Sequence, residues 1–323
     1  MTKQEKTLWS LLGGILILLF LLSSTDWIIK EKKNIIYPVS LILGDTSDDY
    51  YGNFKKGVDK AAEEYNVDVS FITLYEKGDV SQQIDLVKRE VADGAAAVVL
   101  IPVKPEACAK AMDTMALDSP VIIMGNQFPC EGVAGGIAPD YEEQGRILGR
   151  AIASENSSEL PVLIFSRGLS LGYGREIYSG LVSVLTEAGF ETRLIESETE
   201  ETFRQTIEAS VYPGSGMALL AAVDVDSLNS AADIIAGSPV YGHYIKGVYG
   251  IGSTTKLLNQ LDAGIIRGMV VNDQFDAGYL SIEKAVEAIR GGPKKEQTIL
   301  ESYYIQKSSL RENRLEKILY PID

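Results

Sequence analysis

The sequence predicts an α/β protein with two doubly wound lobes, each with a parallel sheet, joined by crossing strands and preceded by a transmembrane helix. From residue 38 onward, short apolar runs alternate with amphipathic helix patterns, and the alternation occurs in two successive rounds. Such alternation builds a mainly parallel sheet with helices on both faces. An uncharged apolar segment close to the N-terminus predicts the transmembrane helix.

The first round contains five short apolar runs separated by helix patterns. The runs predict strands at 39–43, 67–73, 95–101, 121–124 and 132–137. A 3.6-residue periodicity of apolar positions predicts helices at 52–65, 80–92 and 105–117.

The second round repeats the pattern over the rest of the chain. Its strands are expected at 161–165, 192–196, 217–223 and 246–251, with helices at 141–154, 173–188, 200–210 and 227–236. A helix at 274–290 and a strand near 298–305 are expected to close the chain. The helix patterns around Gly57 and Gly180 match loosely, as an internal duplication would.

The N-terminal apolar segment, LWSLLGGILILLFLLSS at 8–24, is near the short end of the roughly 17–25 residues that span a bilayer. Signal peptides have a shorter apolar core and a small-residue cleavage site, whereas Ser23-Ser24-Thr25 is a poor one. We therefore favour an uncleaved anchor over 8–25, with a cleaved signal as the alternative. Residues 1–7 would be cytoplasmic and 26–36 a juxtamembrane spacer. Lysines on both sides of the segment leave its orientation undecided.

Composition excludes several classes of function. The net charge is −15 and the pI is about 4.7, which argues against nucleic-acid binding because that requires Lys and Arg to neutralise phosphates. A single histidine, His243, makes a His-rich metal site or a Ser-His-Asp triad improbable. Cys108 and Cys130 lack C-x-x-C spacing, and a disulfide between them stays open. We expect no metal and no cofactor.

The segment after the first strand is the most informative part of the chain. An acid-rich loop at 44–49 follows that strand, and Tyr50 and Tyr51 come next. Ligands of open α/β sheets bind at the carboxyl ends of the strands. A phosphate-binding loop needs glycines and positive potential. This loop instead offers carboxylates and aromatic faces, which suit hydroxyls, amines and sugar rings.

Several weak motifs occur together in a consistent order. They are Asp48-Asp49-Tyr50-Tyr51 with Gly57, Gln82 or Gln83, Ile101-Pro102, Pro120-Val121-Ile122, Ala138-Pro139-Asp140 with Gly145, the segment 224–232, Gly250-Ile251-Gly252, and Asn272 with Gly278. In this order the chain resembles a type I periplasmic-binding-protein-like solute receptor of the ribose- and galactose-binding group, over about residues 37–306.

The resemblance implies two lobes that close on a ligand by a hinge motion. The first lobe would comprise 37–138 and 273–303, and the second 139–272 and 304–323. The implied ligand-binding residues are Asp48, Tyr50, Tyr51, Asn126, Asp140, Tyr173, Asp224 and Asn272. No catalytic residue is implied.

The chain departs from the sugar-binding pattern at three places. Gly125-Asn126 stands where sugar-binding relatives often carry Asp-Arg, Ile177 stands at the position of the second-lobe arginine, and Ile251-Gly252 replaces Phe-Asp. Bidentate guanidinium contacts to a sugar therefore look largely absent. A sugar or related polar compound is still favoured. A cationic ligand is the alternative, through carboxylates and cation–π contacts.

The function expected from the sequence is that of an extracytoplasmic, membrane-tethered solute-binding protein. It would present its ligand to an ABC importer or to a membrane sensor histidine kinase. A transcriptional regulator with the same core is excluded by the apolar segment in place of a DNA-binding domain. The remaining alternative is an enzyme on the same scaffold, although the chain has no G-x-G-x-x-G after the first strand, no P-loop motif and no G-x-S-x-G.

Overall fold

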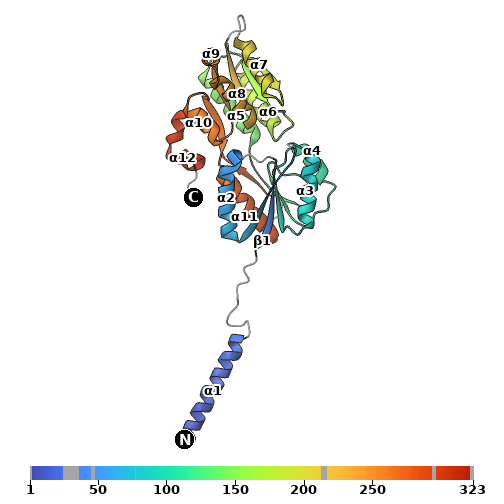
Figure 1. The fold of residues 1–323 in the computed structure, drawn as a ribbon, viewed down its shortest axis with the longest axis vertical. Coiled ribbons are helices and arrows are strands. Elements are labelled where there is room, and N and C mark those ends of the chain that lie inside the picture. The colour runs from blue at the N-terminus through green and yellow to red at the C-terminus, as the bar shows by residue number, and fades with distance from the viewer. Residues whose placement is uncertain are drawn as a thin grey trace. The chain divides into compact units, whose positions relative to one another are not determined.

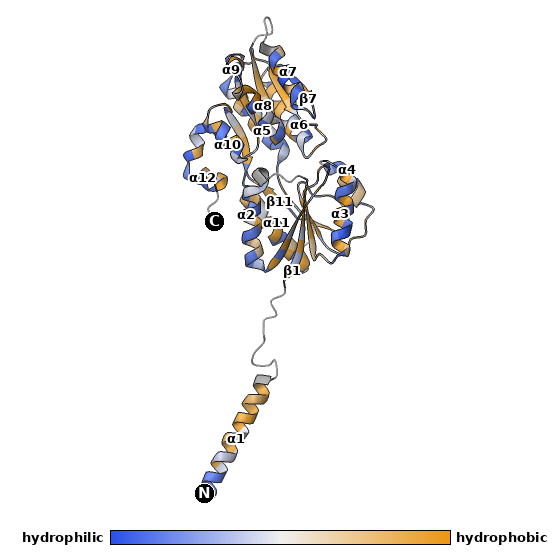
Figure 2. Ribbon diagram, viewed as in Figure 1, coloured by the Kyte–Doolittle hydropathy of each residue, from blue (hydrophilic) through white to orange (hydrophobic). Residues whose placement is uncertain are grey.

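The computed structural model describes residues 2–24, 36–44, 48–76, 78–211, 217–292 and 296–320. The chain forms two compact units, residues 1–36 and residues 37–323. Within the first unit, α1 (Lys3–Ser24) is an apolar helix whose stretch Lys3–Leu22 is long enough to cross a membrane by length and composition. Figure 2 shows the hydrophobic residues that make up most of α1. The predicted apolar N-terminal helix is confirmed, and its insertion in a membrane stays a prediction.

The second unit contains two α/β lobes (Figure 1). The sheet of lobe 1 has the strand order β11-β5-β4-β3-β1-β2, and all of its pairings are parallel. Its strands are β1 (Tyr37–Leu43), β2 (Val67–Thr73), β3 (Ala97–Leu100), β4 (Val121–Met124), β5 (Val133–Pro139) and β11 (Glu296–Leu300).

Helices cover both faces of the lobe 1 sheet, as Figure 1 shows. The α2 (Asp48–Tyr65) and α11 (Gln274–Ile289) helices pack on one face with Leu41, and α3 (Val80–Ala92) and α4 (Pro105–Met112) pack on the other with Ile42. Neighbouring strand residues point to opposite faces. Because helices cover both faces of the central strands, consecutive residues of these strands are buried, and their sequences are continuous apolar runs.

Lobe 2 repeats this design. Its sheet has the order β12-β10-β9-β8-β6-β7 and is parallel except for the edge strand β12, which pairs antiparallel with β10. The strands are β6 (Val162–Ser166), β7 (Thr192–Glu196), β8 (Ala218–Ala222), β9 (Ile245–Ile251), β10 (Gly268–Asn272) and β12 (Ser302–Gln306). One face packs against α5 (Tyr141–Glu155) and α6 (Gly174–Glu187), and the other against α7 (Glu200–Val211), α8 (Val225–Ala236) and α10 (Thr255–Asp262). The short α9 (Pro239–Tyr244) precedes β9.

The chain passes between the lobes after β5, after β10, and between β11 and β12. The fold class predicted from the sequence is thereby confirmed. The single strand predicted near 298–305 is wrong, because β11 belongs to the lobe 1 sheet and β12 to the lobe 2 sheet. The sheets change at Glu301, so the boundary expected at 303 falls inside β12.

Each lobe contains one pair of helices in backbone contact through two glycines. A Cβ at Gly57 of α2 would overlap the Phe275 carbonyl oxygen, and a Cβ at Gly278 of α11 would overlap the Phe54 carbonyl oxygen. In lobe 2, Gly145 and Gly180 meet the carbonyl oxygens of Ile177 and Glu142 in the same way. In every case the contacted carbonyl lies three residues before the partner glycine. This shared spacing supports an internal duplication.

The C-terminal tail packs on lobe 2 and reaches lobe 1. It forms the 3-10 helix η1 (Lys307–Arg311) and α12 (Asn313–Leu319), which the sequence patterns did not predict. Leu315 and Leu319 of α12 are buried in the lobe 2 core. Asn53 Nδ2 of α2 in lobe 1 donates to the Leu319 carbonyl oxygen at 2.9 Å. The tail therefore bridges the two lobes beside the start of α2.

Candidate ligand-binding site

The two lobes meet through residues that follow the carboxyl ends of their strands. The Gly172 N–H, after β6 in lobe 2, donates to the Val103 carbonyl oxygen, after β3 in lobe 1, at 2.9 Å. The Tyr173 ring reaches Gly125, which follows β4. Parallel α/β sheets hold ligands outside the carboxyl ends of their strands. The surface between the lobes is therefore the candidate ligand site.

The predicted residues of the first loop lie in α2. The helix begins at Asp48, so Tyr50 and Tyr51 are helical. The side chains of Asp48 and Tyr50 lie outside the described part of the structure. Tyr51 is buried in the core of lobe 1, where its ring packs edge-on against Phe54, with ring centroids 6.1 Å apart. Ligand contact by these residues stays a prediction.

Asn126 and Asn272 lie at strand ends in the two lobes. Asn126 is exposed, and it follows β4 and Gly125. Asn272 is the last residue of β10, directly before the crossing into α11, and it is half-buried. Both positions are compatible with the role predicted for them.

Asp224 is the best-defined of the predicted residues. It caps α8, and each of its carboxylate oxygens accepts a backbone hydrogen bond, Oδ1 from Ser227 N at 2.8 Å and Oδ2 from Arg167 N at 2.9 Å. Burial raises the pKa of Asp224, and these two hydrogen bonds oppose the shift. Since both oxygens already accept from the protein, Asp224 organises the end of β6 and the start of α8.

Helix capping also accounts for other aspartates at this edge. The exposed Asp140 caps α5 and accepts from Glu143 N at 2.9 Å. Asp273, next to Asn272, caps α11 and accepts from Asp276 N at 3.0 Å, and burial raises the pKa of Asp273. Carboxylates at these positions are stabilised by helix N-termini. Their presence in the sequence therefore needs no cationic ligand to explain it.

Tyr173 crosses from lobe 2 towards lobe 1. Its ring stacks on Tyr141 with centroids 4.1 Å apart and an interplanar angle of 8°, which fixes its orientation. The hydroxyl is buried against Gly125, and no group of the described residues meets it at hydrogen-bond geometry. Burial raises the pKa of Tyr173, and the Asn126 backbone, which lies near the hydroxyl without hydrogen-bond geometry, opposes this shift. An unpartnered buried hydroxyl costs about 1–3 kcal/mol.

Arg167 is a residue at this edge that sequence reasoning missed. It directly follows β6, its guanidinium lies 5.0 Å from the centroid of the Phe203 ring, and its Nη2 donates to Ser230 Oγ at 2.6 Å. Its Nη1 is buried and has no hydrogen-bond partner among the described residues. An arginine immediately after a buried apolar strand was the available signal. Arg175, in the first turn of α6, pairs with Glu106 of lobe 1 at 2.7 Å.

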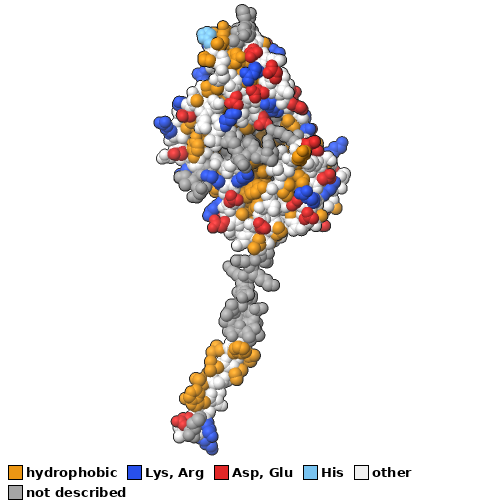
Figure 3. Space-filling view, viewed as in Figure 1, with side chains coloured by type: hydrophobic (Ala, Val, Ile, Leu, Met, Phe, Trp, Pro, Cys, Tyr) orange, Lys and Arg blue, Asp and Glu red, His pale blue; other side chains and the backbone are white. Residues whose placement is uncertain are grey.

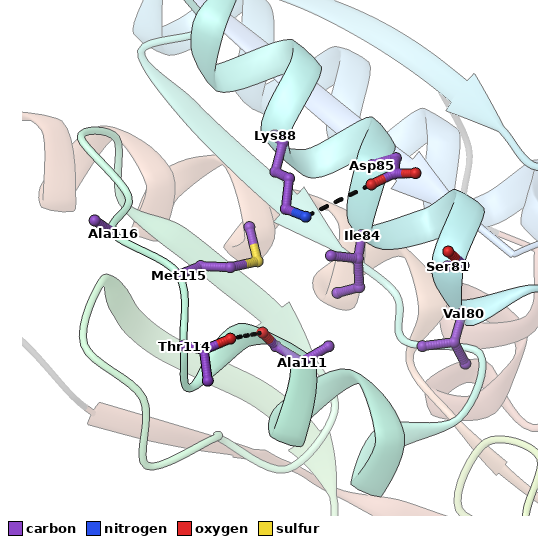
Figure 4. A pocket seen from close by; sticks show the side chains of 9 residues that line it. All are labelled: Val80, Ser81, Ile84, Asp85, Lys88, Ala111, Thr114, Met115 and Ala116. Atoms are coloured by element: carbon purple, nitrogen blue, oxygen red, sulfur yellow. Dashed lines mark hydrogen bonds and ion pairs between the residues drawn. The ribbon is translucent and has the colours of Figure 1, made fainter.

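A groove of about 660 Å³ lies elsewhere, between α3 and the end of α4 in lobe 1 (Figure 4). It is lined by Val80, Ser81, Ile84, Asp85, Lys88, Ala111, Thr114, Met115 and Ala116. The lining has no aromatic side chain, and its Lys88–Asp85 pair is exposed. Ligand sites normally combine apolar or aromatic walls with placed polar groups. None of the predicted ligand-binding residues lines the groove.

Metal and thiol chemistry find no support in the described residues. No cluster of three or more His, Cys, Asp or Glu in the described ranges is placed to hold a metal ion. Cys108 and Cys130 are both buried, and no disulfide joins them. On the face shown in Figure 3, acidic and basic side chains are interspersed over the globular unit.

Comparison with solved structures supports the same fold. GanP, a glucose-galactose binding protein from Geobacillus stearothermophilus, is 16% identical with a TM-score of 0.75, over 86% of this chain and 99% of that one. A carbohydrate transporter solute binding protein from Agrobacterium radiobacter, in complex with D-arabinose, is 19% identical with a TM-score of 0.75, over 88% and 98%. The XylFII-LytSN complex gives 14% identity and a TM-score of 0.71, over 85% and 99%.

These solved chains are covered almost completely, so the likeness of fold extends over their whole length. No curated protein matches the chain in sequence. The periplasmic binding protein domain model matches residues 39–293. The chain belongs to the periplasmic binding protein domain family, whose members are binding proteins and not enzymes.

Proposed function

We propose that the protein is an extracytoplasmic, membrane-tethered receptor that binds a sugar or a related small polar compound between its two lobes and presents it to a membrane partner. The family match over 39–293 carries the proposal. The surface between the carboxyl ends of the two sheets supplies the site, and hinge closure encloses the ligand.

The capping aspartates support a neutral polyhydroxyl ligand over a cationic one. Both oxygens of Asp224 accept backbone hydrogen bonds, and Asp140 and Asp273 cap helices. The exposed Asn126 and half-buried Asn272 amides suit ligand hydroxyls. Two solved structures of the same fold support a sugar ligand. GanP is described as a glucose-galactose binding protein, and the Agrobacterium radiobacter protein is in complex with D-arabinose.

The membrane partner in this proposal is an ABC permease or a sensor histidine kinase. A fixed helical anchor favours the sensor, because signalling needs a defined geometry between receptor and partner. A solved relative described as the XylFII-LytSN complex supports this alternative. The anchor is tested by extracting the protein from the membrane fraction and measuring its mass. The proposal requires that the mature protein retains residues 1–24. A mass that lacks these residues would show that they are a cleaved signal peptide.

Ligand binding is tested by thermal unfolding of residues 37–323 with sugars, polyols, amino acids and polyamines. A ligand at 100 times its dissociation constant stabilises the folded state by about 2.7 kcal/mol. We expect a stabilising sugar or polyol. Stabilisation by polyamines alone would restore the cationic alternative, and turnover of a bound compound would contradict the receptor function.

Matched asparagine variants locate the site. Asn126 is exposed between the lobes, and Asn259 is exposed on α10. We expect Asn126→Ala to weaken binding of the stabilising compound at least tenfold, and Asn259→Ala to leave it unchanged. Equal affinities in both variants would remove Asn126 from the site.

A further inference from the structure

The segment 168–175 of lobe 2, called the interlobe loop below although its last two residues begin α6, contacts lobe 1 at successive positions along its length. Leu171 lies beside Gly78, 3.7 Å from the position of a Cβ there. Gly172 N donates to the Val103 carbonyl oxygen at 2.9 Å. Arg175 Nη1 pairs with Glu106 Oε1 at 2.7 Å. A single short loop therefore supplies apolar, backbone and ionic contacts to the opposite lobe.

The start of the same loop is fixed to its own lobe. The Gly168 N–H donates to Ser166 Oγ at 3.0 Å, and the Leu169 N–H donates to Glu196 Oε1 at 2.7 Å. The Leu171 N–H returns to the Gly168 carbonyl oxygen at 2.9 Å. The loop is thus held to lobe 2 at its base and presents its far end to lobe 1.

Tyr173 and Gly125 are matched to each other across the lobes. Tyr173 is held by its stack on Tyr141, and its hydroxyl occupies the space where a Cβ at position 125 would lie. Gly125 has φ +151°, a conformation that L residues rarely adopt. The approach of the lobes seen here therefore requires glycine at 125.

We propose that the interlobe loop, residues 168–175, is a closure latch in which Tyr173 seats on Gly125 when the lobes close. When Tyr173 is seated, its hydroxyl is buried away from water and has no hydrogen-bond partner among the described residues. The free energy of this unsatisfied group opposes closure. The latch therefore sets the balance between open and closed lobes, and it rests on the proposed function because it presupposes lobes that open and close.

The test uses small-angle scattering of residues 37–323 without ligand, so its outcome is independent of whether a sugar binds. Gly125→Ala places a methyl group where the Tyr173 hydroxyl lies, so the lobes should be held apart. The average radius of gyration should therefore increase. Gly94→Ala is the matched control, because Gly94 also has positive φ, +96°, but has nothing within 4 Å of its Cβ position. We expect no change in radius from Gly94→Ala.

The double variant Gly125→Ala/Tyr173→Ala separates the latch from backbone strain. Removal of the Tyr173 ring relieves the overlap, so the radius should return towards that of Tyr173→Ala alone. If Gly125→Ala and Gly94→Ala give the same radius, or if the double variant is as open as Gly125→Ala, the latch is overturned.

A charge-reversal pair tests the latch without disturbing the core. Glu106 and Arg175 are exposed, with 83% and 58% of their side chains accessible. Glu106→Arg should increase the open population by about twofold, and Glu106→Arg/Arg175→Glu should restore it, more clearly at low salt. Unchanged scattering at low salt in both proteins, together with a failed glycine test, would leave no interlobe role for the loop.

Discussion

The Tyr304 hydroxyl donates a 2.7 Å hydrogen bond to Glu155 Oε1, which joins the edge strand β12 to the end of α5. The same oxygen accepts from Gln306 Nε2 at 2.6 Å, and Oε2 accepts from the Tyr249 hydroxyl at 3.0 Å. Arg267 Nε lies 3.5 Å from Oε2. A largely buried carboxylate is therefore surrounded by donors from β9, β12 and the start of β10. These residues are called the Glu155 cluster below.

Glu155→Ala should destabilise lobe 2 by about 3 kcal/mol, because it leaves two tyrosine hydroxyls and one amide without their acceptor. Glu155→Gln keeps the shape and one acceptor oxygen, and should cost about half as much. Urea unfolding measures both. Glu159→Ala is the control, because Glu159 is exposed near the same end of α5, and it should change stability by less than about 0.5 kcal/mol. If Glu155→Ala and Glu159→Ala lowered the free energy of unfolding equally, the Glu155 cluster would not stabilise lobe 2.

The Glu155 cluster should also make stability fall at alkaline pH. Burial, with the nearby Glu155 carboxylate, raises the pKa of Tyr249 from 10.0 to about 12, although Asn156 opposes the shift, and burial and Glu155 raise the pKa of Tyr304 as well. The unfolded tyrosines therefore ionise first. Their contribution is fully present below pH 10 and is lost as the pH rises towards 12.

Melting temperatures between pH 9 and pH 12 measure this loss. Tyr249→Phe should flatten the decline relative to the wild type, whereas Tyr75→Phe should not, because Tyr75 is 91% exposed. Identical slopes in all three proteins would show that other groups control alkaline unfolding.

The glycine contact between α2 and α11 should be intolerant of a methyl group. Gly57→Ala would drive a Cβ into the Phe275 backbone, and overpacking of this kind costs about 1–3 kcal/mol or more. Gly52→Ala in the same helix meets nothing within 4 Å and should stabilise α2 by about 0.5–1 kcal/mol. Opposite signs of the two changes in the free energy of unfolding are expected. A harmless Gly57→Ala would mean that the helices do not approach this closely.

Asp224→Ala should destabilise lobe 2 by about 2 kcal/mol, since it removes the cap of α8 and the acceptor of the Arg167 N–H. Asp224→Ser keeps an oxygen for the cap and should recover part of the loss. Because burial raises the pKa of Asp224, the ionised carboxylate is less favoured in the folded protein. The cost of Asp224→Ala should therefore be larger near pH 4 than at pH 7, which urea titrations at both values would show.

Local patterns were enough to place many elements. The bounds of β2, β4, β7 and α3 agree with those expected from apolar runs and helix periodicity. The division of the last strand was not predictable in this way. Whether Ile299 pairs with Ala138 and Tyr303 with Val271 depends on strands far away in the sequence, and Glu301 gives no local signal of the change.

The candidate site could be predicted from the sequence only in part. Strand ends placed candidate residues at one edge of the sheets, whereas the capping role of Asp224 depends on hydrogen bonds from Arg167 N and Ser227 N that sequence spacing does not reveal. The seat of Tyr173 on Gly125 arises only when two lobes approach each other. Sequence spacing within either lobe carries no information on that distance.

The return of the chain from lobe 2 to lobe 1 has a consequence for biosynthesis. The helix α11 that faces Gly57, and the edge strand β11, are made only after the entire segment between β5 and β10. Lobe 1 therefore cannot complete its sheet until the ribosome has passed residue 300, whereas lobe 2 by then lacks only β12 and the tail. Lobe 1 is therefore started first but completed only after most of lobe 2 has been made, and through this interval its Gly57 face has no partner helix.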